Sequence, residues 1–251
     1  MLEIKNVTVS FGGLKAVNDF SMNVKEGKIH SLIGPNGAGK TTLFNVITRI
    51  ITPQQGDIIF KGESLNDLHP HDIIHKSISR TFQNLQLFQS MNVFQNIYSG
   101  IVYQYNKSFF SIFSGSRVSF ERDATDKVLE VAEMFDIKNR LSSYPSQLPY
   151  GILKRVEMAR AVVSDPVLLL LDEPAAGLNY LETEEIKDII KMVNKKGKTV
   201  LLVEHDMNVV MNVSDVITVM NFGKKIAEGT PEVISNNEEV IKVYLGEEEH
   251  A

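Results

Sequence analysis

Apolar residues follow a two-residue period at the start of the chain. Leu2, Ile4, Val7 and Val9 are interspersed with polar residues, which is typical of a half-buried strand. The run Leu168–Leu171 is apolar throughout, which indicates a strand buried on both faces. The pattern predicts strands at 2–9, 16–24, 28–33, 57–60, 168–171, 199–203, 216–220 and 225–228.

Other segments carry apolar residues at helical spacing. In 123–135, Val128, Val131, Ala132 and Phe135 fall on one face of a helix. Helices are also predicted at 41–50, 153–163, 181–193 and 207–213. Strands alternate with helices in both outer parts of the chain, which implies a largely parallel sheet with helices on its faces. Gly223 and Gly229 mark a hairpin, which adds an antiparallel part.

The strand pattern fades between residues 87 and 163. This block separates two α/β parts and is predicted to be a helical insertion. Within it, 103–120 is rich in Ser and Phe and has no clean period. Phe109, Phe110 and Phe113 form either a satellite hydrophobic cluster or a partner-binding patch. We therefore predict one core from 1–86 and 164–251, and a helical subdomain from 87–163.

A phosphate-binding loop is predicted between the strand at 28–33 and the helix at 41–50. Gly34 to Thr42 spells Gly-Pro-Asn-Gly-Ala-Gly-Lys-Thr-Thr, which fits the pattern G-x-x-x-x-G-K-[ST]. The glycines let the chain wrap an anion with backbone N–H groups pointing inward. Lys40 would reach the β- and γ-phosphates of a nucleotide, and the Thr41 hydroxyl would contact Mg²⁺. The predicted cofactors are ATP and Mg²⁺, and the loop residues predicted to bind them are Asn36, Gly37, Ala38, Gly39, Lys40, Thr41 and Thr42.

Two carboxylates follow the apolar run at 167–171. Asp172 would lie at the carboxyl end of a buried strand, where ligands collect in open α/β sheets. There it would hold Mg²⁺, directly or through water, and Glu173 could polarise an attacking water. The predicted fold is therefore an α/β P-loop nucleotide-hydrolysing core, mostly parallel with an antiparallel β part, that carries an inserted helical subdomain.

Composition narrows the function classes. The 251 residues carry a net charge of −5, which argues against a basic nucleic-acid-binding surface. The apolar run at 167–171 is too short to cross a bilayer, and the N-terminus has no secretory pattern, so we expect a cytoplasmic location. The absence of cysteine excludes disulfides and thiolate metal sites.

Taken together, these motifs resemble the ATP-binding subunit of an ABC transporter over nearly the whole chain. The resemblance implies an ATPase that powers a permease made of other, multi-span chains. It also implies that Phe11 stacks on adenine, that Gln83 contacts Mg²⁺ and the water, and that His205 hydrogen-bonds the γ-phosphate. The implied catalytic set is Lys40, Gln83, Glu173 and His205, the metal set is Thr41, Gln83 and Asp172, and Phe11, Val17, Tyr150 and Gly151 join the cofactor-binding set.

The family hydrolyses ATP in a head-to-tail pair, in which each site takes a signature loop from the other chain. Here the signature is Leu148-Pro149-Tyr150-Gly151-Ile152, which departs from the usual Leu-Ser-Gly-Gly-Gln. Pro149 supplies neither a hydroxyl nor an N–H, although Tyr150 and Gly151 still offer N–H groups at a helix N-terminus. A further departure is Asn179, where the family usually has Asp. We expect the second ATPase subunit to be a different chain, with a copy of this chain as the alternative.

Four segments resemble branched-chain amino-acid importers: 78–84, the tyrosine within the signature, 204–207 and 243–247. The ending and the segment 80–83 also resemble the ATPases of lipopolysaccharide-export and urea-uptake systems. We predict an amino-acid importer ATPase at the cytoplasmic face of the cell membrane. The alternatives are those two systems, a slow-turnover ATP-gated structural or regulatory module, and a soluble P-loop ATPase acting on nucleic acid, which the acidic balance disfavours.

Overall fold

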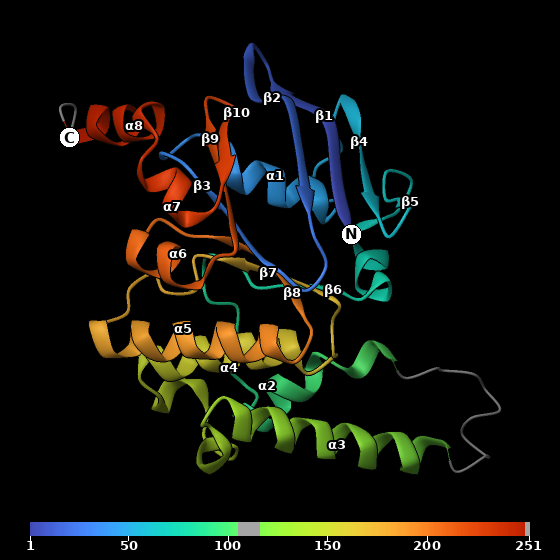
Figure 1. Ribbon diagram of the computed structural model, residues 1–251. Coiled ribbons are helices and arrows are strands. Elements are labelled where there is room, and N and C mark those ends of the chain that lie inside the picture. Colours follow the sequence, from blue (N-terminus) through green and yellow to red (C-terminus); the bar gives the residue numbers. More distant parts are fainter. Residues whose placement is uncertain (105–115, 249–251) are drawn as a thin grey trace.

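The computed structural model describes residues 1–104 and 116–248 (Figure 1). Phe109, Phe110 and Phe113 lie outside the described residues. The strands are β1 Leu2–Phe11, β2 Leu14–Val24, β3 Ile29–Ile33, β4 Gln55–Phe60, β5 Glu63–Ser64, β6 Ile78–Arg80, β7 Leu168–Asp172, β8 Thr199–Val203, β9 Val216–Asn221 and β10 Lys224–Gly229. The helices are α1 Lys40–Ile47, α2 Val93–Ser99, α3 Ser116–Met134, α4 Tyr150–Val162, α5 Tyr180–Lys195, α6 Met207–Val213, α7 Pro231–Ser235 and α8 Glu238–Glu248, with short 3₁₀ turns at Pro70–Lys76, Val102–Gln104, Lys138–Arg140 and Pro145–Gln147.

Two sheets enclose α1 (Figure 1). The larger has the strand order β10-β9-β3-β8-β7-β6, with all neighbours parallel except the β9–β10 hairpin. The smaller is antiparallel, in the order β2-β1-β4-β5. The predicted fold, a mostly parallel core with an antiparallel β part and an inserted helical block, is confirmed.

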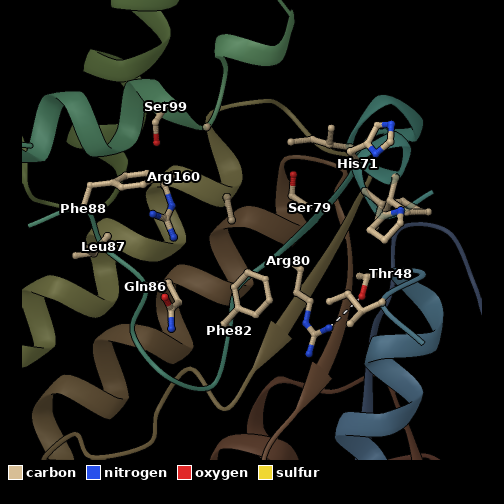
Figure 2. Close-up of a pocket in the computed structure, with 17 residues that line it drawn as sticks. Thr48, His71, Ser79, Arg80, Phe82, Gln86, Leu87, Phe88, Ser99 and Arg160 are labelled. Carbon is tan, nitrogen blue, oxygen red and sulfur yellow. Dashed lines mark hydrogen bonds between the residues drawn. The ribbon is translucent and has the colours of Figure 1, made fainter. Parts of the chain in front are cut away.

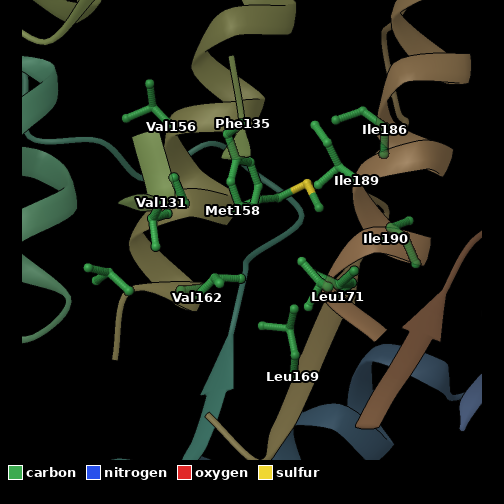
Figure 3. Close-up of a cluster of buried hydrophobic side chains, with 14 of the residues drawn as sticks. Val131, Phe135, Val156, Met158, Val162, Leu169, Leu171, Ile186, Ile189 and Ile190 are labelled. Atoms are coloured by element: carbon green, nitrogen blue, oxygen red, sulfur yellow. The ribbon is translucent and has the colours of Figure 1, made fainter. Parts of the chain in front are cut away.

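The continuous apolar runs are explained by burial of β7 and β8 on both faces. Leu168 and Leu170 point toward α1 and the antiparallel sheet, whereas Leu169 and Leu171 point toward the helices. Figure 3 shows Leu169 and Leu171 below Phe135, Met158 and the isoleucines of α5. Truncating a residue such as Leu171 to Ala would cost about 2–5 kcal/mol of stability.

Several element boundaries differ from the sequence prediction for local reasons. The helix after the P-loop ends at Ile47, not Ile50, because Arg49 turns into the left-handed region (φ 61°) and sends its buried guanidinium to the carbonyls of Asn66 and Leu68. The helix predicted at 123–135 starts seven residues earlier, at Ser116. The sequence prediction missed β6, which has only three residues.

The middle block contains α2, α3 and α4, with no strand among its described residues. The predicted subdomain boundaries at 86/87 and 163/164 stay predictions. Across residues 1–104 and 116–248, no helix combines the length and the apolar character needed to cross a membrane.

A buried histidine lies in β3, the strand that leads to the P-loop. The His30 side chain is 2% exposed, and its Nε2 lies 2.7 Å from the Thr218 hydroxyl oxygen. That hydroxyl donates to Glu228, so His30 Nε2 is the donor in this pair. Burial lowers the pKa of His30 to about 4, with Lys225 acting in the same direction and Glu228 opposing it.

Because the pKa of His30 is lower in the folded state than the ordinary value near 6.5, acid should favour unfolding. The unfolded chain binds the extra proton between about pH 6.5 and pH 4, so the free energy of unfolding falls by up to about 3 kcal/mol over that range. Urea denaturation across this range should show a flatter profile for His30→Gln. His71→Gln, which removes an exposed imidazole, is the matched control. Equal slopes for His30→Gln and wild type would contradict the assignment.

Candidate active site

The P-loop turns from β3 into α1 at Gly39, the N-cap residue, whose backbone lies in the left-handed region (φ 107°). A Cβ at this position would overlap the backbone oxygen of Ala16, so glycine is required here. Lys40 Nζ donates to the backbone oxygens of Gly34 (2.5 Å) and Pro35 (2.8 Å), so its ammonium lies directly over the loop. The N-terminus of α1 and this ammonium make the loop a favourable site for phosphate.

A cleft of about 270 Å³ opens above the loop. All seven loop residues predicted to bind the nucleotide, from Asn36 to Thr42, line it. Gln83 and Glu173 line the same cleft, although they are far apart in sequence from the loop and from each other. Its remaining wall consists of Leu14, Lys15, Ala16 and Phe222.

Three predicted catalytic side chains meet at Glu173. This residue follows β7 directly and has a left-handed backbone (φ 50°), which is a strained conformation for a side-chain-bearing residue. Gln83 Nε2 donates to Glu173 Oε2 at 3.0 Å, and His205 Nδ1 lies 3.9 Å from the same oxygen. The Glu173 side chain is 17% exposed, so it retains access to the cleft.

Asp172 is held behind the cleft by a buried arginine. Its Oδ2 accepts from Arg80 Nη2 at 2.9 Å, and both side chains are almost inaccessible. Burial raises the pKa of Asp172 above its ordinary value, and the Arg80 guanidinium opposes this shift. The other guanidinium nitrogen of Arg80 donates to Asn45 and Thr48 of the P-loop helix and its cap. Arg80 therefore ties three segments of the site together.

The donor set fits a hard divalent cation. Asp172 Oδ1 is buried and has no hydrogen-bond partner among the described residues, which leaves one carboxylate oxygen to be satisfied. Thr41 and Gln83, which carry a hydroxyl and an amide oxygen, line the cleft, and Glu173, the residue after Asp172, lines it too. Across the described residues, no cluster of three or more His, Cys, Asp or Glu could hold a metal by itself. A magnesium ion here would therefore share oxygens of Asp172, Thr41 and Gln83 with phosphate.

The sequence prediction missed Glu204, which holds the backbone on either side of the site through hydrogen bonds. This buried carboxylate accepts from the backbone N–H of Ala175 (2.8 Å), His205 (2.9 Å) and Asp206 (3.3 Å). Burial raises the pKa of Glu204, and these three donors oppose the shift. It therefore fixes the turn that carries His205 against the loop that follows Glu173. The only signal in the sequence was an acidic residue directly after the apolar strand 199–203.

Two charged residues of α4 hold the same region from the helical side, and the sequence prediction missed both. Lys154 is 1% exposed, and its Nζ donates to the backbone oxygens of Glu173 (3.3 Å) and Gln83 (3.5 Å). One turn later, Glu157 accepts from the Gln86 N–H at 3.2 Å. The helix that begins at the signature loop thus fixes the backbone on both sides of the Gln83–Glu173 contact.

The signature loop itself lies outside this chain's own cleft. Pro149 is the N-cap of α4 and makes no side-chain cap bond, as its chemistry requires. Neither Tyr150 nor Gly151 is among the residues that line the cleft in the described part of the chain. A Cβ at Gly151 would overlap the carboxylate of Glu182, so α4 and α5 approach closely there. Asn179 is the N-cap of α5 and exchanges two hydrogen bonds with Glu182.

Two predicted cofactor-binding residues lie beside the cleft without lining it. Phe11 ends β1 opposite Leu14 and is 52% exposed at the tip of the hairpin. Val17 is fully buried, and its side chain belongs to the core under the antiparallel sheet. Among the described residues, the aromatic side chain in the cleft wall is instead that of Phe222.

Comparison with known proteins identifies the family. Residues 17–176 match the ABC transporter family, and residues 224–250 match the branched-chain amino acid ATP-binding cassette transporter family. The high-affinity branched-chain amino acid transport ATP-binding proteins LivG of Salmonella typhimurium and BraF of Pseudomonas aeruginosa are each 42% identical to this chain, with 98% of both sequences covered.

Solved structures agree. An ATP-binding cassette of an ABC transporter in its ADP conformation superimposes with a TM-score of 0.86 at 30% identity, covering 98% of each chain. A dimeric cassette in a post-hydrolysis state, bound to ADP and phosphate, gives 0.78 at 27% identity, with 92% of this chain and 99% of that chain covered. This chain therefore belongs to the ABC transporter ATP-binding proteins of the branched-chain amino acid subfamily, and it is an ATPase that drives transport.

Replacing Glu173 with Gln should separate binding from hydrolysis. The amide keeps an oxygen for the bond from Gln83 but cannot accept a proton, so turnover should fall by roughly 10²–10⁴-fold while ATP affinity is retained. Phosphate release by the assembled transporter and calorimetric ATP binding measure the two quantities. Asp188→Asn, an exposed carboxylate change on α5, is the control. Near-normal turnover of Glu173→Gln would remove the residue from its catalytic role.

Proposed function

We propose that this chain powers the uptake of branched-chain amino acids through a permease made of other chains, at the cytoplasmic face of the cell membrane. The observation that carries the proposal is the convergence of the P-loop, Gln83 and Glu173 on one cleft, in a chain whose full-length relatives are named for this transport. The match of residues 224–250 to the branched-chain family supports the same substrate class.

In the proposed reaction, Lys40 and the N-terminus of α1 bind the β- and γ-phosphates of ATP. Glu173 accepts a proton from the attacking water, and Gln83 orients the Glu173 carboxylate through its 3.0 Å bond. His205, whose Nδ1 lies 3.9 Å from Glu173 Oε2, hydrogen-bonds the γ-phosphate. Magnesium, held by Thr41, Gln83 and Asp172, would neutralise phosphate charge when bound.

The proposed permease contact is a larger cleft, of about 650 Å³, between the core and the helical block (Figure 2). Phe82, Phe88 and Ile50 line it, and each is between 41% and 52% exposed, so it presents apolar surface to a partner. The segment 82–88 forms one wall and also carries Gln83 to the catalytic cleft. An occupant of this cleft would therefore contact the same segment that orients Glu173.

A transport assay tests the substrate and the permease contact together. Deleting this subunit should abolish uptake of labelled leucine, isoleucine and valine, and wild-type chain but not Lys40→Ala should restore it. Phe88→Asp should reduce permease-stimulated turnover and uptake by at least tenfold, because it replaces an exposed aromatic side chain of the cleft, which packs against Arg160, with a hydrated carboxylate. It should leave ATP affinity unchanged.

The matched control for Phe88→Asp is Val233→Asp, which alters an equally exposed apolar residue on α7. Loss of urea uptake with normal leucine uptake after deletion would refute the amino-acid assignment. Normal stimulation of Phe88→Asp by the permease would refute the cleft as the contact.

We propose further that the second ATPase subunit is a different chain with a standard signature. That partner's signature would complete the site built on Lys40 and Glu173, whereas Pro149 and Ile152 of this chain would leave the partner's site with fewer donors to the γ-phosphate. Loss of one preorganised donor lowers a rate by about 10²–10³-fold. The two sites would then turn over unequally.

In the assembled transporter, Lys40→Ala should abolish transport, whereas the matching lysine change in the partner should have a smaller effect. Changing Pro149 to Ser and Ile152 to Gln should raise the turnover of the slower site. Light scattering of Glu173→Gln protein with ATP should report a monomer. A tight ATP-dependent homodimer would refute the asymmetric assembly and would show that Tyr150 and Gly151 form a working signature.

A further inference from the structure

The turn between β9 and β10 carries an unusual phenylalanine. Phe222 is 83% exposed, and its backbone lies in the left-handed region (φ 43°). A bulky aromatic residue is costly in this conformation, which asparagine or glycine adopts more readily. Strained residues that persist in a fold concentrate at binding sites. Neither packing nor backbone preference explains Phe222 at this position.

The turn is fixed relative to the nucleotide cleft. Asn18 N–H donates to the Gly223 oxygen at 2.9 Å, and Gly223 N–H donates to the oxygen of Ala38 in the P-loop, also at 2.9 Å. Strand β10 also packs against β2. Both backbone groups of Gly223 are therefore hydrogen-bonded, and they hold the preceding residue, Phe222, beside the P-loop.

The cleft wall has two chemically different parts. Backbone N–H groups of the P-loop and the Lys40 ammonium form the part that suits phosphate. Phe222 and Leu14 supply apolar surface in the same cleft wall, and Leu14 is 70% exposed. Phe11 lies across the β1–β2 hairpin from Leu14. An apolar wall in a phosphate-binding cleft suits the base or sugar of a nucleotide, because a ring face stacks on any base without hydrogen bonds.

We infer that Phe222 contacts the base of bound ATP and acts with Phe11 to hold the nucleoside end of the ligand. The inference rests on ATP binding by the family and assigns a residue beyond the motifs that carry it. The ring supplies affinity for the base and makes no contact with phosphate. Its removal should therefore weaken ATP binding on the order of tenfold and leave inorganic triphosphate binding unchanged.

The chain has no tryptophan, so Phe222→Trp creates a single fluorescent reporter. ATP should quench or shift its emission, whereas inorganic triphosphate bound at the P-loop should not. Phe11→Trp tests the neighbouring aromatic in the same way. Ile241→Trp, on α8, is the exposed control and should respond to neither ligand. The titrations use the isolated chain in the Glu173→Gln background, so that hydrolysis does not intervene.

Phe222→Asn gives an independent readout that misfolding cannot imitate. Asparagine tolerates the left-handed backbone, so the variant should melt at a higher temperature than wild type while its ATP affinity falls. Lys40→Ala, in contrast, should weaken both ATP and triphosphate, which separates a failed nucleotide site from a failed base contact.

An unchanged ratio of ATP to triphosphate affinity in Phe222→Asn, with emission of Phe222→Trp that ignores ATP, would overturn the inference. Emission that changes only when the second ATPase subunit is added would overturn it too, because Phe222 would then be a subunit contact.

Discussion

Parallel strands that are buried on both faces can expose polar side chains only at their ends, and this constraint builds the active site. Leu32 of β3 and Asp172 of β7 both pair with Val203 of β8, so the three strands finish at one level. The P-loop, the Asp172–Glu173 pair and the Glu204–His205 pair therefore emerge side by side. Apolar interior strands and a cluster of charges at one edge are two results of the same packing.

Buried charges then fix the loops that leave this edge. Arg80 links Asp172 to the P-loop helix, Glu204 gathers three backbone N–H groups, and Lys154 contacts two backbone oxygens. Burying such groups costs several kcal/mol of desolvation each, so they add little net stability. Their contribution is geometric, because in this arrangement of the loops each joins segments that are distant in sequence. The precision of the site is thus maintained by groups that a purely apolar core would not need.

Sequence reasoning predicted what local pattern encodes. The P-loop, the strand before Asp172 and the position of Glu173 followed from short motifs and apolar runs, and most strands lie within two residues of their predicted bounds. It failed where the cause was distant in sequence. Lys154 looks like an ordinary surface lysine of a helix, and only the packing of α4 on the loops after β6 and β7 shows that it is buried. The position of Phe222 in the cleft wall likewise depends on hydrogen bonds between its turn and two other segments.

Lys154 also has a consequence for timing. It lies one turn into the helix that starts at the signature loop, yet its ammonium contacts the backbone of the chain's own Glu173. In a head-to-tail pair, a signature loop that moves toward the partner's nucleotide would move this lysine as well. The lysine would then shift the backbone of Glu173 in the chain's own nucleotide site. This chain would thus couple the two sites, because engagement of its signature loop at the partner's nucleotide would move the backbone of its own Glu173. The two sites would then hydrolyse ATP in a coupled order and not independently of each other.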